Sequence, residues 1–105
     1  MTTYYIYILE CSNGALYTGY TTNLERRYQE HMQGSSKCKY TRAFPPKCLA
    51  ACWQINGTLS NTLKIEALIK KLKRPKKLNL INSPERLLAQ CHHITQAITS
   101  YHYQP

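Results

Sequence analysis

Three stretches of the chain carry the β-branched and aromatic residues that favour strands. Residues 4–10 are almost wholly apolar or aromatic, and residues 15–20 resume this pattern after the turn-forming Ser12-Asn13-Gly14. These two stretches predict a β-hairpin. Residues 48–55 are a third apolar run, which ends at Asn56-Gly57 and predicts a well-buried strand. Together the three stretches predict a small antiparallel sheet.

The length of the hairpin loop decides which tyrosines share a face of this sheet. A two-residue loop places Tyr7 opposite Tyr20 and puts Tyr7 and Tyr17 on opposite faces. A three-residue loop, with Gly14 in the left-handed conformation, places Tyr7 opposite Gly19. Tyr7 and Tyr17 then become diagonal neighbours on one face, with room above Gly19. We favour the second register.

The remaining pattern predicts helices. A capping box, Thr22-x-x-Glu25, begins the first helix, and Gly34 ends it. A second helix is expected from about residue 60 to 72, and a short one from 76 to 81 after the break at Arg74-Pro75. Residues 35–47 are expected to form a basic, aromatic loop.

A last helix is expected from Pro84 onward. Its apolar residues repeat at steps of three and four, and this seam packs on the domain or, alternatively, forms a dimer contact. The seam consists of Leu87, Cys91, Ile94, Ile98 and Tyr101.

The resulting order is β-β-α-β-α-α-α, an α+β fold in which helices flank a three-stranded antiparallel sheet. The chain of 105 residues is expected to be one domain over residues 1–82, with residues 83–105 as a helical extension packed on it.

The net charge indicates which classes of molecule the protein binds. Fourteen Lys and Arg face five acidic residues, a formal net charge of +9, which attracts nucleic acid first and anionic membranes second. A merely soluble basic protein is the plain alternative. The acidic residues are all Glu, so the Asp clusters of two-metal nucleases are excluded, and any hydrolytic chemistry must use one carboxylate or none.

Two further patterns concern the compartment. The longest apolar stretch falls well short of the ~18 residues of a membrane span, and Met1 leads into a strand-like run rather than a signal peptide. We therefore expect a cytoplasmic protein whose five cysteines are reduced. A zinc site formed by Cys91, His92 and His93 is a weak alternative, because adjacent histidines point apart on a helix.

The first predicted helix has an unusual inward stripe. Leu24, Arg27, Tyr28 and His31 fall at i, i+3, i+4 and i+7, so a guanidinium and an imidazole lie on the side that normally faces the core. This placement indicates a polar cleft. Each candidate also has an ordinary structural explanation, such as ion pairs of Arg27 with Glu30 and of Glu66 with Lys70.

Six residues, in this order of elements, resemble the GIY-YIG nuclease superfamily over residues 5 to about 82, most closely its small stand-alone bacterial members. They are Tyr7, Tyr17, Gly19, Arg27, His31 and Glu66. Tyr5-Ile6-Tyr7 is similar to the GIY half-motif and Tyr17-Thr18-Gly19 to the YIG half, with Tyr5 and Thr18 replacing the usual glycine and isoleucine.

The resemblance implies a metal-dependent endonuclease that hydrolyses phosphodiester bonds in DNA, with little sequence specificity and a role in DNA repair or recombination. Glu66 is expected to hold one Mg²⁺ or Mn²⁺, Tyr7 to take the proton of the attacking water, and Tyr17 to position the water or phosphate. Arg27 clamps the phosphate, and His31 relays a proton or orients the tyrosine. These side chains are expected to converge on one sheet face.

Other polar and basic residues are expected to extend the site. The family's downstream polar position corresponds to Asn79 or Asn82. Two segments are expected to contact phosphates, with a solvated lysine-rich face as the alternative. They comprise Lys37, Lys39, Tyr40 and Arg42 in one, and Lys70, Lys71, Lys73 and Arg74 in the other.

The expected partner is nucleic acid, DNA ahead of RNA, with no membrane, for a monomer or weak dimer that can have a protein partner. The alternative functions are a non-catalytic nucleic-acid-binding module and an accessory subunit that needs a partner.

Overall fold

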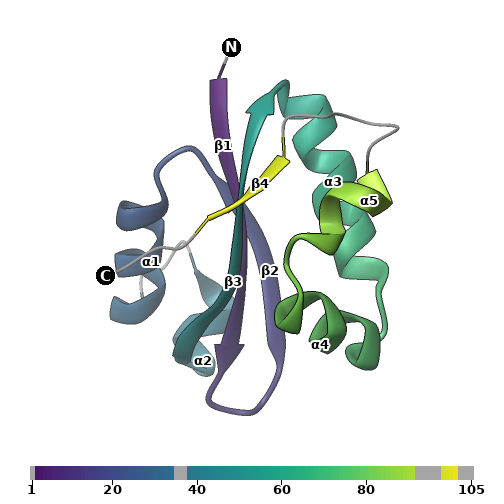
Figure 1. The fold of residues 1–105 in the computed structure, drawn as a ribbon. Helices are drawn as coiled ribbons and strands as arrows, with labels where there is room; N and C mark the ends of the chain where they lie inside the picture. Colours follow the sequence, from purple (N-terminus) through teal and green to yellow (C-terminus); the bar gives the residue numbers. More distant parts are fainter. Residues whose placement is uncertain (1, 35–37, 92–97, 102–105) are drawn as a thin grey trace.

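The computed structural model describes residues 2–34, 38–91 and 98–101. Within them a four-stranded antiparallel sheet has helices on both faces (Figure 1). The strands are β1 (Thr2–Cys11), β2 (Leu16–Thr21), β3 (Pro46–Gly57) and β4 (Ile98–Ser100). The helices are α1 (Leu24–Gln33), α2 (Lys39–Ala43), α3 (Leu59–Lys71), α4 (Arg74–Asn82) and α5 (Arg86–Cys91). The α+β class is therefore confirmed.

The sheet has the strand order β2-β1-β3-β4, which makes β2 an edge strand. The hairpin has the favoured register: Tyr7 lies opposite Gly19, Leu9 lies opposite Tyr17, and Gly14 has φ of 84°. Because alternate residues of a strand point to opposite faces, Tyr7, Tyr17 and Gly19 share the face that α1 covers.

The expectation of three strands is wrong, because Ile98–Ser100 pairs with β3 as a fourth strand. The apolar spacing of the C-terminal segment suits a helix, but Ile98-Thr99 is β-branched and finds an unpaired strand edge at Trp53 to Ile55. The expected last helix extends only over Arg86–Cys91 among the described residues. Ile94 and the histidines of the weak zinc alternative lie outside the described residues.

Two local expectations are also corrected. Residues 39–43, expected within a loop, form the short helix α2. The N-cap of α1 is Asn23 rather than Thr22, because the Asn23 side chain accepts a hydrogen bond from the backbone N–H of Arg26 at 3.0 Å. Gly34 ends α1 in the left-handed conformation as expected, with φ of 69°. The boundary at residue 83 stays a prediction.

Each face of the sheet has its own core (Figure 1). One core lies between the sheet and α3, α4 and α5, and the other between the sheet and α1. The first contains Ile6, Ile8, Ala51, Trp53, Ile55, Ile65, Ile69, Leu80, Leu87, Cys91 and Ile98, and the second contains Tyr7, Leu9, Cys11, Leu24, Tyr28 and Cys52. Among the described residues, no helix combines the length and apolar character that crossing a membrane requires.

One hydroxyl in the interior has no hydrogen-bond partner among the described residues. Thr18 is buried on β2, and its Oγ1 is unpaired. A buried polar atom without a partner costs free energy of folding, because it loses its hydrogen bonds to water.

We therefore expect Thr18→Val to raise the free energy of unfolding by about 1 kcal/mol. The matched control is Thr62→Val, because the buried Thr62 hydroxyl donates to the carbonyl of Thr58 at 3.0 Å and its loss lowers stability. Urea denaturation of both variants measures the two effects. A destabilised Thr18→Val protein contradicts the prediction.

Candidate active site

The phenol of Tyr7 lies directly on Gly19. A Cβ at position 19 would lie 2.5 Å from the Tyr7 hydroxyl and 2.7 Å from its Cζ, so only glycine leaves room for this ring. The Tyr7 residue is 2% exposed. The register of the hairpin therefore creates the space that the ring occupies.

The Tyr7 hydroxyl bonds to His31 on α1. The distance from Tyr7 Oη to His31 Nε2 is 2.8 Å, and His31 Nδ1 lies 2.7 Å from the hydroxyl of Thr41 on α2. Both His31 and Thr41 are buried. This chain of contacts joins β1, α1 and α2 through polar side chains.

From the contacts of Thr41 we infer which nitrogen of His31 carries the proton. Thr41 Oγ1 donates to the carbonyl of Cys38 at 3.3 Å, so the same oxygen accepts from His31 Nδ1–H. Nε2 is then the bare nitrogen, and it accepts the O–H of Tyr7. The geometry thus gives Tyr7 a proton acceptor.

The pKa values agree with this assignment. Burial, together with the charge of Arg27, lowers the pKa of His31 from 6.5 to about 4, so the imidazole is neutral at pH 7. Burial raises the pKa of Tyr7, although the hydrogen bond and charge of Arg27 act in the opposite direction.

Arg27 lies at the open side of this group. Its guanidinium lies near enough to Tyr7 to lower the pKa of the phenol, and it forms an ion pair with Glu30 at 3.3 Å. The ordinary pairing foreseen for Arg27 therefore exists beside its contact with the tyrosine. The Arg27 side chain is 30% exposed, so solvent or a ligand can reach part of it.

Tyr17 completes the group on this face of the sheet. Its ring contacts that of His31, with centroids 5.4 Å apart, and it stacks on Tyr40 of α2 at 5.6 Å. Four of the five expected catalytic residues, Tyr7, Tyr17, Arg27 and His31, thus come together.

Glu66 approaches from the opposite layer. It lies on α3, the helix that packs against the other face of the sheet, so the expected convergence on one face is wrong for this residue. Its negative charge nevertheless contributes to the raised pKa of Tyr17, after the larger effect of burial. Because Tyr17 belongs to the edge strand β2, we infer that the carboxylate reaches the site around that edge.

Whether the site can hold a divalent metal ion depends on the Glu66 carboxylate. The Glu66 side chain is 12% exposed and pairs with Lys70 at 3.6 Å, as its i,i+4 spacing foresaw. Among the described residues no cluster of three His, Cys, Asp or Glu side chains forms a metal cage. A single carboxylate oxygen donor fits Mg²⁺ or Mn²⁺, which keep several water ligands, and does not fit a structural zinc site.

The comparisons with known proteins agree with this geometry. The family model of the GIY-YIG catalytic domain matches residues 3–79. The chain belongs to the GIY-YIG family. The order of the motifs and the fold of this nuclease family thus account for the placement of the two tyrosines.

Individual relatives support the same assignment. The chain is 49% identical over 84 residues to a UPF0213 protein of Syntrophus aciditrophicus, covering 79% of this chain and 95% of the relative. It is 40% identical over 79 residues to one of Halalkalibacterium halodurans, covering 75% and 82%. The solution NMR structure of a UPF0213 protein from Bacillus halodurans matches with 36% identity and a TM-score of 0.50, covering 84% of this chain and 95% of that one.

The other expected site residues of this GIY-YIG domain have varied positions. Lys37 lies outside the described residues. Lys39, Arg42, Lys70, Lys71 and Lys73 are exposed, and Arg74 donates to the carbonyl of Gly14 at 2.6 Å. Asn79 and Asn82 are both exposed on α4. Their roles stay predictions.

Sequence reasoning did not identify Thr41, the side chain that contacts His31 Nδ1. It lies in the five-residue helix α2, whose length is too short for an apolar repeat to reveal. A buried threonine beside a histidine gives no signal in the sequence, because the two positions are ten residues apart and meet only when α2 folds against α1.

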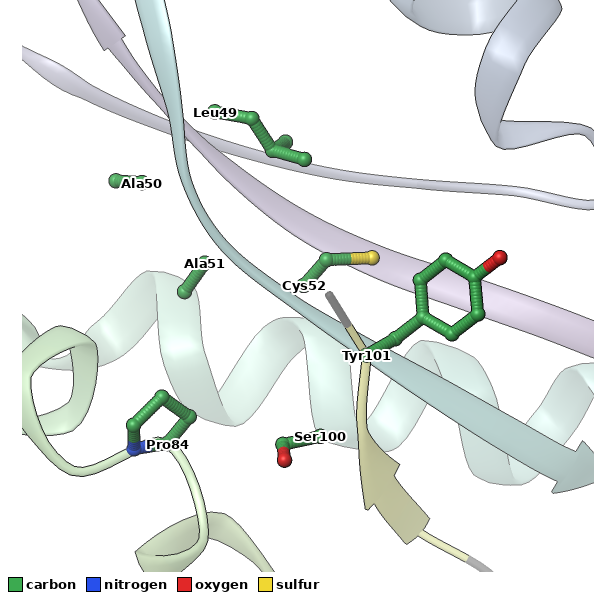
Figure 2. Close-up of a pocket in the computed structure, with 7 residues that line it drawn as sticks. All are labelled: Leu49, Ala50, Ala51, Cys52, Pro84, Ser100 and Tyr101. Atoms are coloured by element: carbon green, nitrogen blue, oxygen red, sulfur yellow. The ribbon is translucent and has the colours of Figure 1, made fainter. Parts of the chain in front are cut away.

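A hollow of about 230 Å³ lies elsewhere, at the opposite side of the sheet from β2. Figure 2 shows that it opens between β3, Pro84 in the connection from α4 to α5, and the end of β4. It is lined by Leu49, Ala50, Ala51, Cys52, Pro84, Ser100 and Tyr101. This hollow contains none of the GIY-YIG motif residues.

The buried imidazole predicts acid sensitivity. Since the pKa of His31 is lowered from 6.5 to about 4, the unfolded chain binds its proton more readily between these values. Above pH 6.5 the free energy of unfolding therefore carries no penalty from His31. As the pH falls from 6.5 toward 4, the free energy of unfolding decreases by on the order of 3 kcal/mol. Denaturation curves from pH 7 to 4 should show a shallower decline for His31→Gln. Equal slopes contradict the prediction.

The contact between Tyr7 and Gly19 predicts coupled stability effects. We expect Gly19→Ala to cost about 2 kcal/mol by overpacking, and less in a Tyr7→Phe background, because the hydroxyl is the nearest atom. Gly57→Ala is the control, since a Cβ there meets nothing within 4 Å. A double-mutant cycle measured by urea denaturation gives the coupling. Additive effects contradict the predicted contact.

Proposed function

We propose that this GIY-YIG protein is a metal-dependent endonuclease that hydrolyses phosphodiester bonds in DNA. The observation that carries the proposal is the hydrogen bond of 2.8 Å between the Tyr7 hydroxyl and Nε2 of His31, with Arg27 beside it. Phosphodiester hydrolysis needs an activated water, positive charge at the phosphate and a route for the proton. These residues offer all three in one place.

The proposed proton route uses both partners of that hydrogen bond. The attacking water gives its proton to the Tyr7 oxygen while the Tyr7 proton passes to His31 Nε2, 2.8 Å away. The resulting hydroxide forms the new bond to phosphorus, the bond to the leaving oxygen breaks, and that oxygen takes up a proton from solvent. His31 Nε2 then returns its proton to Tyr7, and Tyr7 releases one proton to solvent, which restores both residues. His31 carries the positive charge in between, with its Nδ1–H held by Thr41. This route lets a tyrosine act as base although its pKa is raised.

Arg27 and Tyr17 hold the phosphate in this proposal. The partly exposed guanidinium of Arg27 suits a phosphate oxygen, because a guanidinium can donate two parallel hydrogen bonds. A bound phosphate also offsets the positive charge of Arg27, which is one cause of the low pKa of His31. Tyr17, half-buried beside His31, is placed to orient the phosphate or the water.

Glu66 is the residue that would hold the divalent ion. When bound, the ion supplies positive charge to the phosphate and the leaving oxygen. Lys70, now paired with Glu66 at 3.6 Å, is exposed and free to turn toward solvent or a second phosphate. GIY-YIG nucleases generally use divalent metals, which supports this assignment.

The surface charge supports a nucleic-acid substrate. The net charge of +9 attracts a polyanion, and the exposed Lys39, Arg42, Lys71 and Lys73 suit phosphate contacts. These residues offer no pattern for reading base edges, so cleavage is expected to tolerate many sequences. A role in repair or recombination would fit such an enzyme.

A non-catalytic nucleic-acid-binding module is the second candidate. The burial of Tyr7, 2% exposed, favours it, because an attacking water must reach the phenol. An accessory subunit that cleaves only with a partner would share the same site, and activity that appears when a cell extract is added would identify it.

The decisive experiment is a nicking assay on supercoiled plasmid and branched DNA with Mg²⁺ or Mn²⁺. We expect Arg27→Ala and Glu66→Gln each to slow cleavage at least about 100-fold, with DNA affinity changed only a few-fold. The matched controls are Arg26→Ala and Glu25→Gln, which alter exposed residues of the same types on α1 and should cleave normally. A folded protein that binds DNA but cuts none of these substrates with either metal overturns the enzyme proposal.

A further inference from the structure

Three aromatic rings form a continuous group at the edge of the candidate active site. Tyr17 and Tyr40 stack with centroids 5.6 Å apart and an interplanar angle of 21°, and Phe44 follows Tyr40 at 5.4 Å and 47°. Tyr40 is 38% exposed and Phe44 40%. We call Tyr17, Tyr40 and Phe44 the aromatic ledge.

The aromatic ledge is held in place by hydrogen bonds. The side-chain amide of Asn13 donates to the Tyr40 hydroxyl at 3.0 Å, while the Asn13 carbonyl oxygen accepts from the backbone of Ala15 at 3.1 Å. The backbone N–H of Phe44 donates to the carbonyl of Tyr40 at 2.9 Å. The Tyr40 ring is therefore held at its hydroxyl and by its stacking on Tyr17, which reduces the entropy lost on binding.

Positive charge surrounds these rings. Lys39 and Arg42 are exposed on α2, the helix that carries Tyr40. Arg74 bonds to Gly14 at 2.6 Å, in the same turn that holds Asn13. A ligand that joins a flat π surface to a negative charge matches this combination, and a nucleotide unit of a nucleic acid is such a ligand.

We propose that the aromatic ledge is a stacking site for one nucleobase next to the phosphate that is cleaved. Tyr17 belongs to the ledge and also contacts His31, with centroids 5.4 Å apart, so a base on the ledge and a phosphate at Arg27 belong to neighbouring positions of one strand. The inference rests on the proposed nucleic-acid substrate, but it does not require cleavage.

The base must offer an exposed face. In a continuous duplex both faces of each base are covered by neighbouring base pairs, so such DNA does not supply this ligand. An unpaired base and the terminal base pair of a duplex end both supply it. The shared chemistry is an uncovered base face with its phosphate, and the experiment separates the two sources.

The test compares binding to three DNA forms in EDTA, where a metal-dependent enzyme does not cut. Fluorescence anisotropy gives Kd for a short single strand, a blunt-ended duplex and a covalently closed duplex minicircle. The variants are Phe44→Leu, which keeps an apolar side chain but removes the ring, and Phe44→Trp, which enlarges the ring. Leu63→Ala is the control, since Leu63 is an exposed apolar residue on α3, outside the ledge.

We expect Phe44→Leu to raise Kd for the single strand, the blunt duplex or both by roughly 5- to 150-fold, and Phe44→Trp to bind at least as tightly as the wild type. The affected form identifies the source of the base. Minicircle binding should stay within about twofold, and the slope of log Kd against log salt should not change, because a ring carries no charge. Lys39→Gln with Arg42→Gln should reduce that slope.

The proposal is overturned if folded Phe44→Leu binds all three forms as the wild type does, or if it weakens all three equally. Cleavage failure with ledge-dependent binding would reject the enzyme proposal alone. Cleavage that is unaffected by loss of the ring, together with unchanged binding, would reject the stacking site alone.

Discussion

The placement of the Tyr7 ring on the bare backbone of Gly19 is the constraint on which the site depends. It requires the three-residue hairpin loop, because only that register puts Tyr7 opposite Gly19. The ring then carries its hydroxyl to His31, and His31 in turn is oriented by Thr41. A local choice of backbone geometry at Gly14 thus fixes a polar chain that crosses three elements.

Much of the fold follows from local sequence signals. The strand runs, the hairpin register and the glycine that ends α1 are all set by neighbouring residues, and they agree with the structure. The fourth strand and α2 could not be predicted in this way, since Ile98–Ser100 is extended only through pairing with β3, and α2 is one turn packed against α1. Both owe their conformation to tertiary contacts that leave no periodic trace.

In the candidate site too, some features follow from local sequence signals and others depend on tertiary contacts. The i, i+4 spacing of Arg27 and His31 predicted their shared face, and the register brought the two tyrosines beside them. The approach of Glu66 from the other layer depends on how α3 packs at β2, which no pattern in the sequence specifies. The neutral state of His31 follows from burial, a property of the folded protein. The resemblance to GIY-YIG nucleases named these residues without giving either of these facts.

The edge position of β2 has a mechanical consequence. At this edge the Tyr17 ring contacts His31 of α1, and the charge of Glu66 on α3 influences Tyr17, while the exposed Lys70 pairs with Glu66. A molecule bound at this edge would contact both the layer of α1 and the layer of α3. Its binding would then reduce the sliding of these two layers relative to each other, and the bound protein would be more rigid than the free protein.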